Sequence, residues 1–387
     1  MCPRSQNRGW EHMVCGYNNK RSPDESIFPA GVGFGVSYGC EEREAMNGMG
    51  RKRGVPKSKI VTTVLVLVGL APVTLRVHGQ SEAVSFARQG DTIQVAIGGK
   101  PFTTYNFDLK TAKAYLQPLR NASGVIVTRG FPIGDTIPAG HEHDRSLEPH
   151  QRAMYFAHGD INGFNFWSEE VFSKYYGHGY HSAFGRMVFR KIEGVRGGRF
   201  FGTIRATFDL EGPDRIPFAE EVQQFTFSGD SNSRAIDCEF IVRARQGPVK
   251  FGDTKEGVFA LRLAPELDAP TGTMVSSEGG EGEAQIWGKR ANWVDVDGVI
   301  DGQALGVAIF DSPKSFRHPT YWHARGYGLF AANPFGLRDF FHDTHQDGSY
   351  TIPAGRSIQF RYRVFIHDGN YKQAHVAERY SEYAANE

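Results

Sequence analysis

Apolar and polar side chains alternate with a period of two over much of the chain that follows residue 80. The clearest example is the run SIQFRYRVFIH at residues 357–367. Its alternate positions carry the residues Ile358, Phe360, Tyr362, Val364 and Ile366. Because successive side chains of an extended chain point to opposite faces, this pattern predicts a β-strand with one buried face. A helix would need a period of about 3.6 residues.

Similar strand-length runs occur along the chain, bounded by Gly, Pro, Asp or Ser. They read FGTIRATFDL, EVQQFTFSG, AIDCEFIVRA, GVFALRLA and ALGVAIFD. The best helix candidate is the tail at residues 370–387, which has no Gly or Pro. Many short strands without alternating long helices predict an all-β fold. We therefore expect a large antiparallel β-sandwich with few short helices and a C-terminal helix.

The beginning of the chain has the layout of a secretory signal. A basic cluster at residues 51–59 precedes an apolar run from Ile60 to Leu75, and the small residue Gly79 follows. The apolar run is shorter than the ~20 residues that span a bilayer. We therefore predict a signal peptide at residues 49–80, with an uncleaved anchor as the alternative.

Three expectations about organisation follow from this signal. Residues 1–48 form a disordered extension or reflect a start codon assigned too early, and residues 81–387 form a single β-sandwich domain. The protein is exported to the periplasm or the extracellular space and has no membrane contact after cleavage. Its 44 basic and 43 acidic side chains give a net charge of +1, and no clustered basic surface indicates binding to nucleic acid.

The first candidate segment for a functional site is Glu148 to Glu170. If HQRAMYFAH is extended, His150, Arg152 and His158 share one face and form a cationic or metal-binding patch. Asn162 then lies in a turn, and Trp167 belongs to an aromatic group that follows it. The alternative interpretation is a polar strand end above an aromatic core.

Two further segments combine charged and aromatic residues. Lys255 and Glu256 are adjacent in a turn that enters the GVFALRLA strand, where extended geometry points them in opposite directions, and Glu256 shares parity with Arg262. Trp287 and Trp293 share strand parity near Lys289. Aromatic faces with flanking cations suit sugar rings, although packing in the core explains the same tryptophans equally well.

The densest candidate is FRHPTYWHARGYGLFAANPFG, residues 316–336. Pro319 favours extended geometry at the preceding His318. After it, His323 and Arg325 project to one side of the strand and Trp322 projects to the other. Asn333 precedes a proline in a turn that closes the segment. We expect this segment to line the functional pocket.

No catalytic motif of a known class occurs, and the sequence requires no cofactor. A divalent metal assembled from His150, His158 and His323 remains an alternative, because neutral imidazoles bind several transition metals. The sequence does not identify a metal.

Taken together, the segments resemble a family of secreted bacterial proteins often labelled "methane oxygenase PmoA", which is otherwise a domain of unknown function. The matching stretches are PHQRAMYFAHGDINGFNFW, FGDTKEGVFALRLA, WGKRANWVD, FDSPKSFRHPTYWHARGYGLFAANPFG and GRSIQFRYRVFIHDG. The resemblance covers essentially residue 81 to the C-terminus. The family usually shows HHRG where this chain has HQRA, so Gln151 stands at the position of a second histidine. No apolar run of ~20 residues follows Leu75, so the chain is not the multi-span membrane subunit of particulate methane monooxygenase.

Our leading hypothesis is an enzyme of this PmoA-like family that acts on carbohydrate as an epimerase, lyase or hydrolase. By analogy, the expected architecture is a mutarotase-like supersandwich. The expected partner is a small-molecule or oligosaccharide ligand. The alternatives are a metal-dependent oxidoreductase that uses the three histidines and a non-catalytic carbohydrate-binding module.

Each candidate residue has a role in this hypothesis. The candidate catalytic residues are His150, His158, Lys255, Glu256, His323 and Arg325. A histidine would act as general acid or base near neutral pH, with Glu256 as its base partner. The candidate substrate-binding residues are Arg152, Asn162, Trp167, Arg262, Trp287, His318, Trp322 and Asn333. Among these, the tryptophans would form a sugar platform.

Overall fold

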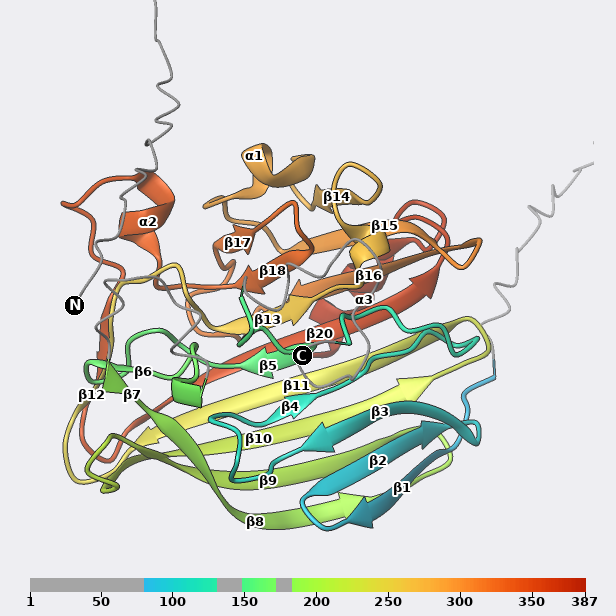
Figure 1. The fold of residues 1–387 in the computed structure, drawn as a ribbon. Helices are drawn as coiled ribbons and strands as arrows, with labels where there is room; N and C mark the ends of the chain where they lie inside the picture. The colour runs from blue at the N-terminus through green and yellow to red at the C-terminus, as the bar shows by residue number, and fades with distance from the viewer. Residues whose placement is uncertain (1–79, 131–147, 172–182) are drawn as a thin grey trace, which may run out of the picture. The chain divides into compact units, whose positions relative to one another are not determined.

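The computed structural model describes residues 80–130, 148–171 and 183–387 (Figure 1). The predictions for residues 1–48 and for the signal peptide lie outside the described residues, apart from Gln80. The chain forms two eight-stranded antiparallel sheets with a few short helices, which confirms the predicted all-β class. No helix within the described residues is long and apolar enough to cross a membrane.

The first sheet carries the N-terminal strands and the strands that support the candidate site. Its order is β1 (Val84–Gln89), β2 (Thr92–Ile97), β3 (Lys100–Asn106), β4 (Tyr115–Leu116), β5 (Met154–Phe156), β13 (Phe259–Arg262), β18 (Leu329–Ala332) and β17 (Trp322–Ala324). Every neighbouring pair in it is antiparallel. Strands that are distant in the sequence therefore meet at its centre.

The second sheet contains the longer strands. Its order is β14 (Thr273–Ser276), β15 (Trp293–Ile300), β16 (Gln303–Asp311), β20 (Ser357–Asp368), β11 (Ser233–Ala244), β10 (Pro217–Gly229), β9 (Gly202–Glu211) and β8 (Arg186–Arg196). Two small sheets pair β12 (Val249–Phe251) with β19 (Tyr350–Ile352) and β6 (Phe164–Asn165) with β7 (Ala183–Phe184). The helical elements are η3 (Pro265–Leu267), α1 (Gly282–Ile286), α2 (Leu337–Phe341) and α3 (Val376–Asn386).

The main hydrophobic core lies between the two large sheets. The ring of Phe156 in β5 stacks on Phe240 in β11 with centroids 4.3 Å apart, and Phe259 in β13 stacks on Tyr362 in β20 at 4.9 Å. The apolar parity of β20 that the sequence indicates is buried in this core. Side chains from both sheets therefore form one apolar layer, as in other β-sandwiches.

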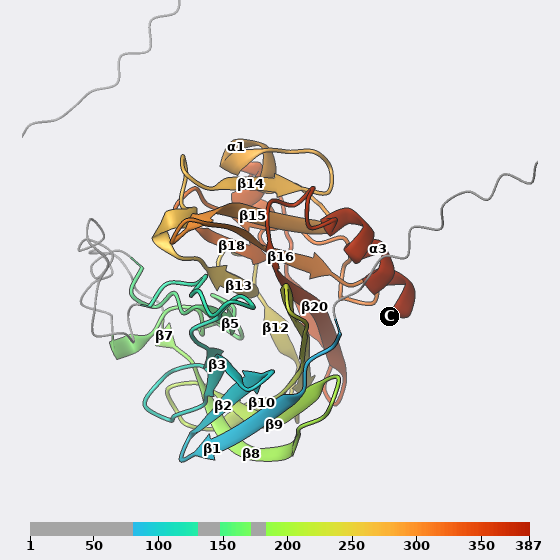
Figure 2. The ribbon, with the colours of Figure 1, turned by 90° about the vertical axis from the view of Figure 1, so that its right-hand side faces the viewer.

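The C-terminal helix α3 covers the outer face of the second sheet (Figure 2). Val376 and Tyr383 of the helix pack with Phe310 and Phe365, which are the outward residues of β16 and β20. This contact explains why β20 carries an apolar side chain on its otherwise polar face. The helix predicted in the tail is confirmed over Val376–Asn386.

The outer face of the first sheet carries a different set of residues. Strand register aligns Tyr155 of β5 with Ala260 of β13, Ala260 with Ala331 of β18, and Ala331 with His323 of β17. Trp167, which follows β6, packs with Tyr155 and the two alanines in one buried cluster. We call these five residues the outer-face row. The small alanine side chains leave the space that Trp167 occupies.

Candidate functional site

A pocket of about 560 Å³ brings together several of the residues singled out in the sequence. It is lined by Lys255, Glu283, Ala284, Trp287, Arg325, Asp339 and His342. Lys255 precedes β13, Trp287 follows α1, and Arg325 begins the turn between β17 and β18. Three of the predicted site residues thus lie in one pocket.

Arg325 lies flat against Trp287 on one side of this pocket. Its guanidinium carbon is 4.1 Å from the centroid of the indole ring. The Arg325 Nη1 donates to Glu283 Oε1 at 2.7 Å, and the backbone N–H of Gly326 donates to Glu283 Oε2 at 2.7 Å. Glu283 therefore holds Arg325 in place, and the guanidinium covers one face of the predicted sugar platform.

His323 is the member of the outer-face row that contacts the pocket residue Trp287. Its ring is perpendicular to Trp287 with centroids 5.0 Å apart, and nearly parallel to Trp167 at 6.3 Å. Burial lowers the pKa of His323 to about 3, and the charges of Arg325 and Lys255 add to this effect. The neutral ring has Nδ1 2.9 Å from the Lys255 carbonyl oxygen, so we assign the proton to Nδ1. Nε2 is then a hydrogen-bond acceptor.

Glu256 is the carboxyl group of this region whose pKa lies near neutral pH. Burial raises its pKa to about 7; the charge of Lys255 lowers the pKa, and Glu148 and Asp339 raise it further. Its side chain is 31% exposed, so the carboxyl group can be reached from solvent. Lys255 Nζ lies 4.0 Å from Glu256 Oε1. The expectation that these adjacent side chains point in opposite directions is wrong, because they precede β13 in a loop.

Other side chains hold this loop through its backbone. Asn333 Nδ2 donates to the carbonyl oxygens of Thr254 and Lys255 at 2.9 and 2.8 Å, and its Oδ1 accepts the N–H of Phe335. Asp339 Oδ2 accepts the N–H of Lys255 at 2.7 Å. Asn333 is fully buried, its amide group is engaged by these three backbone groups, and it does not line the pocket. It fixes the backbone next to Glu256.

Replacing Asn333 with Ala is expected to destabilise the fold by about 1–3 kcal/mol, because the Thr254 carbonyl loses its donor and the buried N–H of Phe335 loses its acceptor, while the Lys255 carbonyl keeps His323 alone as its donor. Urea unfolding measures this effect. Asn386→Ala is the matched control, since its amide donates to the Glu382 carbonyl at an exposed position of α3. Equal stabilities of the two variants would contradict the role given to Asn333.

Glu148, Tyr327 and Arg262 lie at another edge of the site. The Arg262 guanidinium is 4.4 Å from the centroid of the Tyr327 ring, and Arg262 is buried. Burial raises the pKa of Glu148, opposed by the charges of Arg262 and Lys255. The charges of Glu148 and Glu256 also raise the pKa of Tyr155. Arg262 therefore belongs to the surroundings of the site, in a cation–π contact with Tyr327.

A buried ion network lies beside the outer-face row. Arg152 donates from Nε and Nη2 to the two oxygens of Glu169 at 2.9 and 2.8 Å. Lys113 Nζ is 3.4 Å from Glu169 Oε1 and also donates to the Trp167 carbonyl. Burial lowers the pKa of Lys113 to about 8. Arg152, predicted to bind substrate, is bound to Glu169 in this network.

His150 lies next to the same network. It is almost fully buried, its ring meets Trp167 edge-on at 6.3 Å, and its Nε2 is 3.4 Å from Glu148 Oε2. Burial and the neighbouring charges of Lys113 and Arg129 lower its pKa well below the ordinary value. His150 is therefore neutral at pH 7.

His158 does not line the pocket, although the next residue, Gly159, donates its N–H to the Glu256 carbonyl. The His158 ring packs against Phe251 and Phe335, with centroids 5.3 and 5.1 Å away, and its Nε2 is 2.8 Å from the Gly252 carbonyl. The predicted shared face of His150, Arg152 and His158 is wrong, because β5 spans only Met154–Phe156. Within residues 80–130, 148–171 and 183–387, no group of three or more His, Cys, Asp or Glu side chains could hold a metal ion. The three histidines thus do not form one ligand set.

Three other predicted contact residues do not line the pocket. Trp322 belongs to the core between the sheets, and its Nε1 donates to the Ala291 carbonyl at 3.0 Å. His318 Nδ1 lies 2.9 Å from Asp311 Oδ2, and Asn162 Oδ1 accepts the N–H of Lys250 at 2.7 Å. The predicted opposition of Trp322 and His323 across the strand is confirmed. The sugar contact predicted for Trp322 finds no support in this placement, since the indole lies in the core and not at the pocket.

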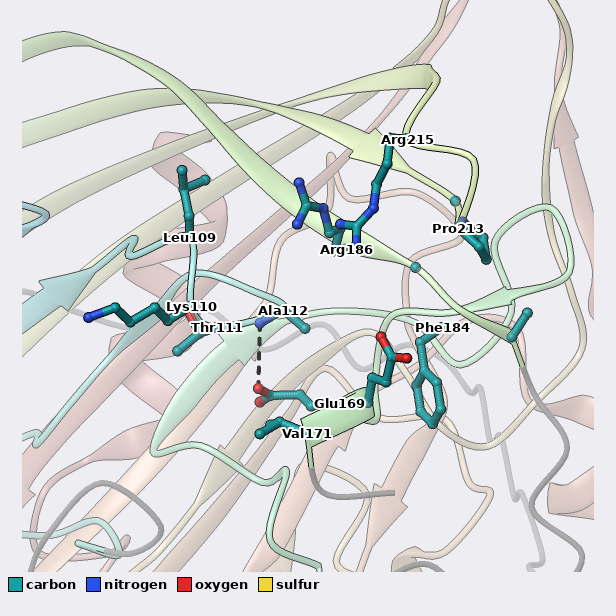
Figure 3. Close-up of a pocket in the computed structure, with 14 residues that line it drawn as sticks. Leu109, Lys110, Thr111, Ala112, Glu169, Val171, Phe184, Arg186, Pro213 and Arg215 are labelled. Carbon is teal, nitrogen blue, oxygen red and sulfur yellow. Dashed lines mark hydrogen bonds between the residues drawn. The ribbon is translucent and has the colours of Figure 1, made fainter. Parts of the chain in front are cut away.

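A second cavity of about 460 Å³ lies beside β7 and β8 (Figure 3). Figure 3 shows Arg186 and Arg215 on one side and Glu169 on the other. The cavity meets the ion network only through Glu169, whose Oε2 accepts the N–H of Ala112 at 3.4 Å. None of the predicted site residues lines it. The pocket with Lys255, Trp287 and Arg325 is therefore the candidate site.

Several residues of the site had no signal in the sequence. Glu283 and Asp339 come from the five-residue helices α1 and α2, and the sequence around Glu283 resembles a flexible surface loop. Tyr155 lies in an apolar run that reads as core. An acidic residue four positions before Trp287 is the one pattern that could have indicated Glu283.

Comparisons with known proteins give the following similarities. Residues 92–381 match a family of unknown function, DUF6807. No curated protein matches the chain. Among solved structures, a galactose mutarotase-like protein from Clostridium acetobutylicum is 11% identical with a TM-score of 0.37, and the match covers 74% of this chain and 99% of that protein. A putative aldose 1-epimerase from Klebsiella pneumoniae is 10% identical with a TM-score of 0.35, covering 77% and 86% of the two chains.

A third similar structure is a GH36 α-galactosidase from Geobacillus stearothermophilus. It is 12% identical with a TM-score of 0.36, and the match covers 74% of this chain but 41% of the galactosidase. The family match spans most of the strands of both sheets and all the residues that line the candidate site. This chain therefore belongs to the DUF6807 family of unknown function.

Proposed function

We propose that this protein is a carbohydrate-active enzyme in which Glu256 transfers a proton and His323 accepts a hydrogen bond from a substrate hydroxyl. The observation that carries this proposal is the partly exposed side chain of Glu256, with a pKa of about 7, 4.0 Å from the Nζ of Lys255, which lines the pocket of about 560 Å³. Buried titratable groups with shifted pKa values are typical of functional sites.

The pKa values favour Glu256 over His323 as the acid–base group. A general acid or base works best when its pKa lies near the working pH. His323, with a pKa of about 3, is protonated in only about one molecule in 10⁴ at pH 7. It is therefore too weak a base to act alone. This assignment reverses the roles expected from the sequence, where histidine was the acid–base group and Glu256 its partner.

The composition of the pocket supports a sugar as substrate. The indole of Trp287, two carboxylates and Lys255 surround the space, and such mixtures of an aromatic ring with planar polar groups suit polyhydroxylated rings. Lys255 would stabilise negative charge that develops on the substrate.

The two acids that line the pocket both hold other groups of the protein, and this favours proton abstraction over hydrolysis. Glu283 is bound to Arg325 and to the Gly326 amide, and Asp339 is bound to the Lys255 amide. A hydrolase with two free carboxyl groups would need a second acid at the scissile bond, and Glu148, the other acid that influences Glu256, lies 3.4 Å from His150 Nε2. We therefore favour proton abstraction from a sugar, as in an epimerase or a lyase.

A substrate panel tests this proposal. Purified protein is incubated in D₂O with neutral and acidic monosaccharides and oligosaccharides, and proton NMR follows solvent deuterium incorporation and new products. Deuterium at a sugar carbon supports epimerisation, and a new double bond supports elimination. Binding without conversion would favour the non-catalytic binding module. If no carbohydrate is bound or converted, the proposal is wrong.

A further inference from the structure

Three side chains of the outer-face row keep buried polar atoms that no group in the described part of the protein satisfies. They are the hydroxyl of Tyr155, Nε1 of Trp167 and Nε2 of His323. Each residue is at most 2% exposed. A buried polar atom without a partner costs free energy, so such atoms are rare in native proteins and usually indicate a ligand or an ordered water.

The three residues form one continuous surface. Trp167 contacts Tyr155 with ring centroids 4.9 Å apart and lies nearly parallel to His323 at 6.3 Å. Ala260 and Ala331 lie between Tyr155 and His323 in the strand register. His323 in turn meets Trp287, which lines the candidate pocket. The surface therefore begins directly beneath the pocket.

The hydroxyl of Tyr155 lies within the electrostatic influence of the acids of the site. Burial raises the pKa of Tyr155, and the charges of Glu256 and Glu148 raise it further. The phenol therefore stays protonated and can donate a hydrogen bond. Together the three side chains offer two donors, Tyr155 O–H and Trp167 N–H, and one acceptor, His323 Nε2.

We propose that Tyr155, Trp167 and His323 form a closed subsite for the hydroxyl groups of a terminal sugar unit. The assignment rests on the proposed function and names its substrate class: free monosaccharides or chain ends, not internal units of a polysaccharide. A hydroxyl group both donates and accepts. A carboxylate could not donate to His323, and an ammonium group could not accept from Trp167.

The preference for a chain end follows from the floor of the subsite. The backbones of β13 and β18 lie directly beneath Trp167, since Ala260 and Ala331 carry the smallest side chains that still have a Cβ. A sugar ring that reaches the buried polar atoms meets Trp167, which is packed on this sheet. A polysaccharide chain cannot continue beyond it, so the bound ring must be the last one.

Tyr155→Phe tests the subsite, because it removes only the hydroxyl. The variant is expected to melt at or above the wild-type temperature, since no hydrogen bond within the protein is lost. It should bind its monosaccharide at least 10-fold more weakly, measured by titration calorimetry with D-glucose, D-galactose, D-mannose and D-xylose. Tyr105→Phe is the matched control. Its buried hydroxyl donates to Gln223 Oε1 at 2.8 Å in the core between the sheets, two strands away from β5, so that variant should lose stability and keep its affinity.

A pair of oligosaccharides tests the chain-end preference. Maltoheptaose has chain ends, whereas β-cyclodextrin is a ring of the same units without any, and the corresponding pair is used if another sugar binds. Equal recognition of the linear and the cyclic compound would overturn the preference.

The outcomes separate this inference from the proposed function. Sugar binding that Tyr155→Phe leaves unchanged would overturn the subsite but uphold action on carbohydrate. The same holds if the protein converts a polysaccharide and binds no monosaccharide. A lower melting temperature of Tyr155→Phe would show that the hydroxyl has a partner without ligand, which also overturns the subsite. If wild-type protein binds and converts no carbohydrate at all, both proposals are wrong.

Discussion

Glu256→Gln is expected to lower the turnover of the sugar substrate by about 10²–10⁴-fold, the usual contribution of a general acid or base. The amide keeps the size of the carboxyl group but cannot take up or release a proton at neutral pH. Lys255 remains in place, so substrate binding should change much less than turnover. Steady-state kinetics that separate kcat from KM measure the two effects.

The same variant should be more stable than the wild type in alkaline solution. The folded-state pKa of Glu256 is raised from its ordinary value of 4.5 to about 7, so the folded protein holds this proton more tightly than the unfolded chain. That stabilisation is complete below pH 4.5 and is lost as the pH rises through 7. The melting temperature of Glu256→Gln should therefore exceed that of the wild type at pH 8, with the difference vanishing toward pH 4.5.

Glu221→Gln is the matched control for both readouts. Glu221 lies in β10 facing the core, accepts a hydrogen bond from Gln223 at 2.8 Å, and has its pKa raised by burial to about 8. This variant makes the same chemical change and should also gain stability at high pH, yet keep full turnover. Equal losses of turnover in the two variants, or full activity of Glu256→Gln, would contradict the assignment of Glu256.

Glu169→Ala is expected to destabilise the fold by about 3–5 kcal/mol, because it leaves Lys113 and Arg152 as buried cations without this partner. All three side chains are less than 5% exposed. Although burial raises it, the net pKa of Glu169 is lowered by Lys113 and Arg152, so the carboxylate is charged at neutral pH. Urea unfolding at pH 7 measures the loss.

The pH dependence of this loss identifies its cause. Burial already lowers the pKa of Lys113 to about 8, and removal of Glu169 should lower it further. The unfolded chain then binds the Lys113 proton more tightly than the folded protein up to pH 10.5, so stability rises with pH across this window. The loss of stability in Glu169→Ala should therefore become smaller between pH 7 and pH 9. Part of the loss should remain, because Arg152 stays charged across this range.

Lys113→Met serves as the control, since Arg152 and Glu169 still neutralise each other in that variant. It should cost much less stability than Glu169→Ala. If the two variants are equally unstable, or if the deficit of Glu169→Ala does not change with pH, buried charge is not the cause.

The strand alternation carried most of the correct predictions. It identified the buried face of β20 and the opposite directions of Trp322 and His323 in β17, because a side-chain period of two holds wherever the backbone is extended. The same argument was wrong for His150, Arg152 and His158, since only Met154–Phe156 form β5. In the irregular chain before β5, odd or even sequence position does not predict the direction of a side chain.

The remaining site residues depend on contacts that no local pattern encodes. Lys255, Trp287 and Arg325 were recognised by their type, but Glu283 and Asp339 lie on helices of five residues without cap side chains. The outward direction of Tyr155 follows from its register with Ala260, which the sequence does not specify. The pKa of Glu256 likewise depends on burial and on the charges of Glu148 and Asp339, which are distant from it in the sequence.

The alignment of Tyr155, Ala260, Ala331 and His323 also has a kinetic consequence. These residues come from four strands separated by long stretches of chain, and their pairing closes large loops at high entropic cost. During folding, a long hairpin such as β10 with β11 needs only local pairing. The subsite, in contrast, exists only after four strands are in register, namely β5, β13, β18 and β17. Activity that returns after dilution from denaturant therefore reports the completion of the first sheet rather than the initial collapse of the chain.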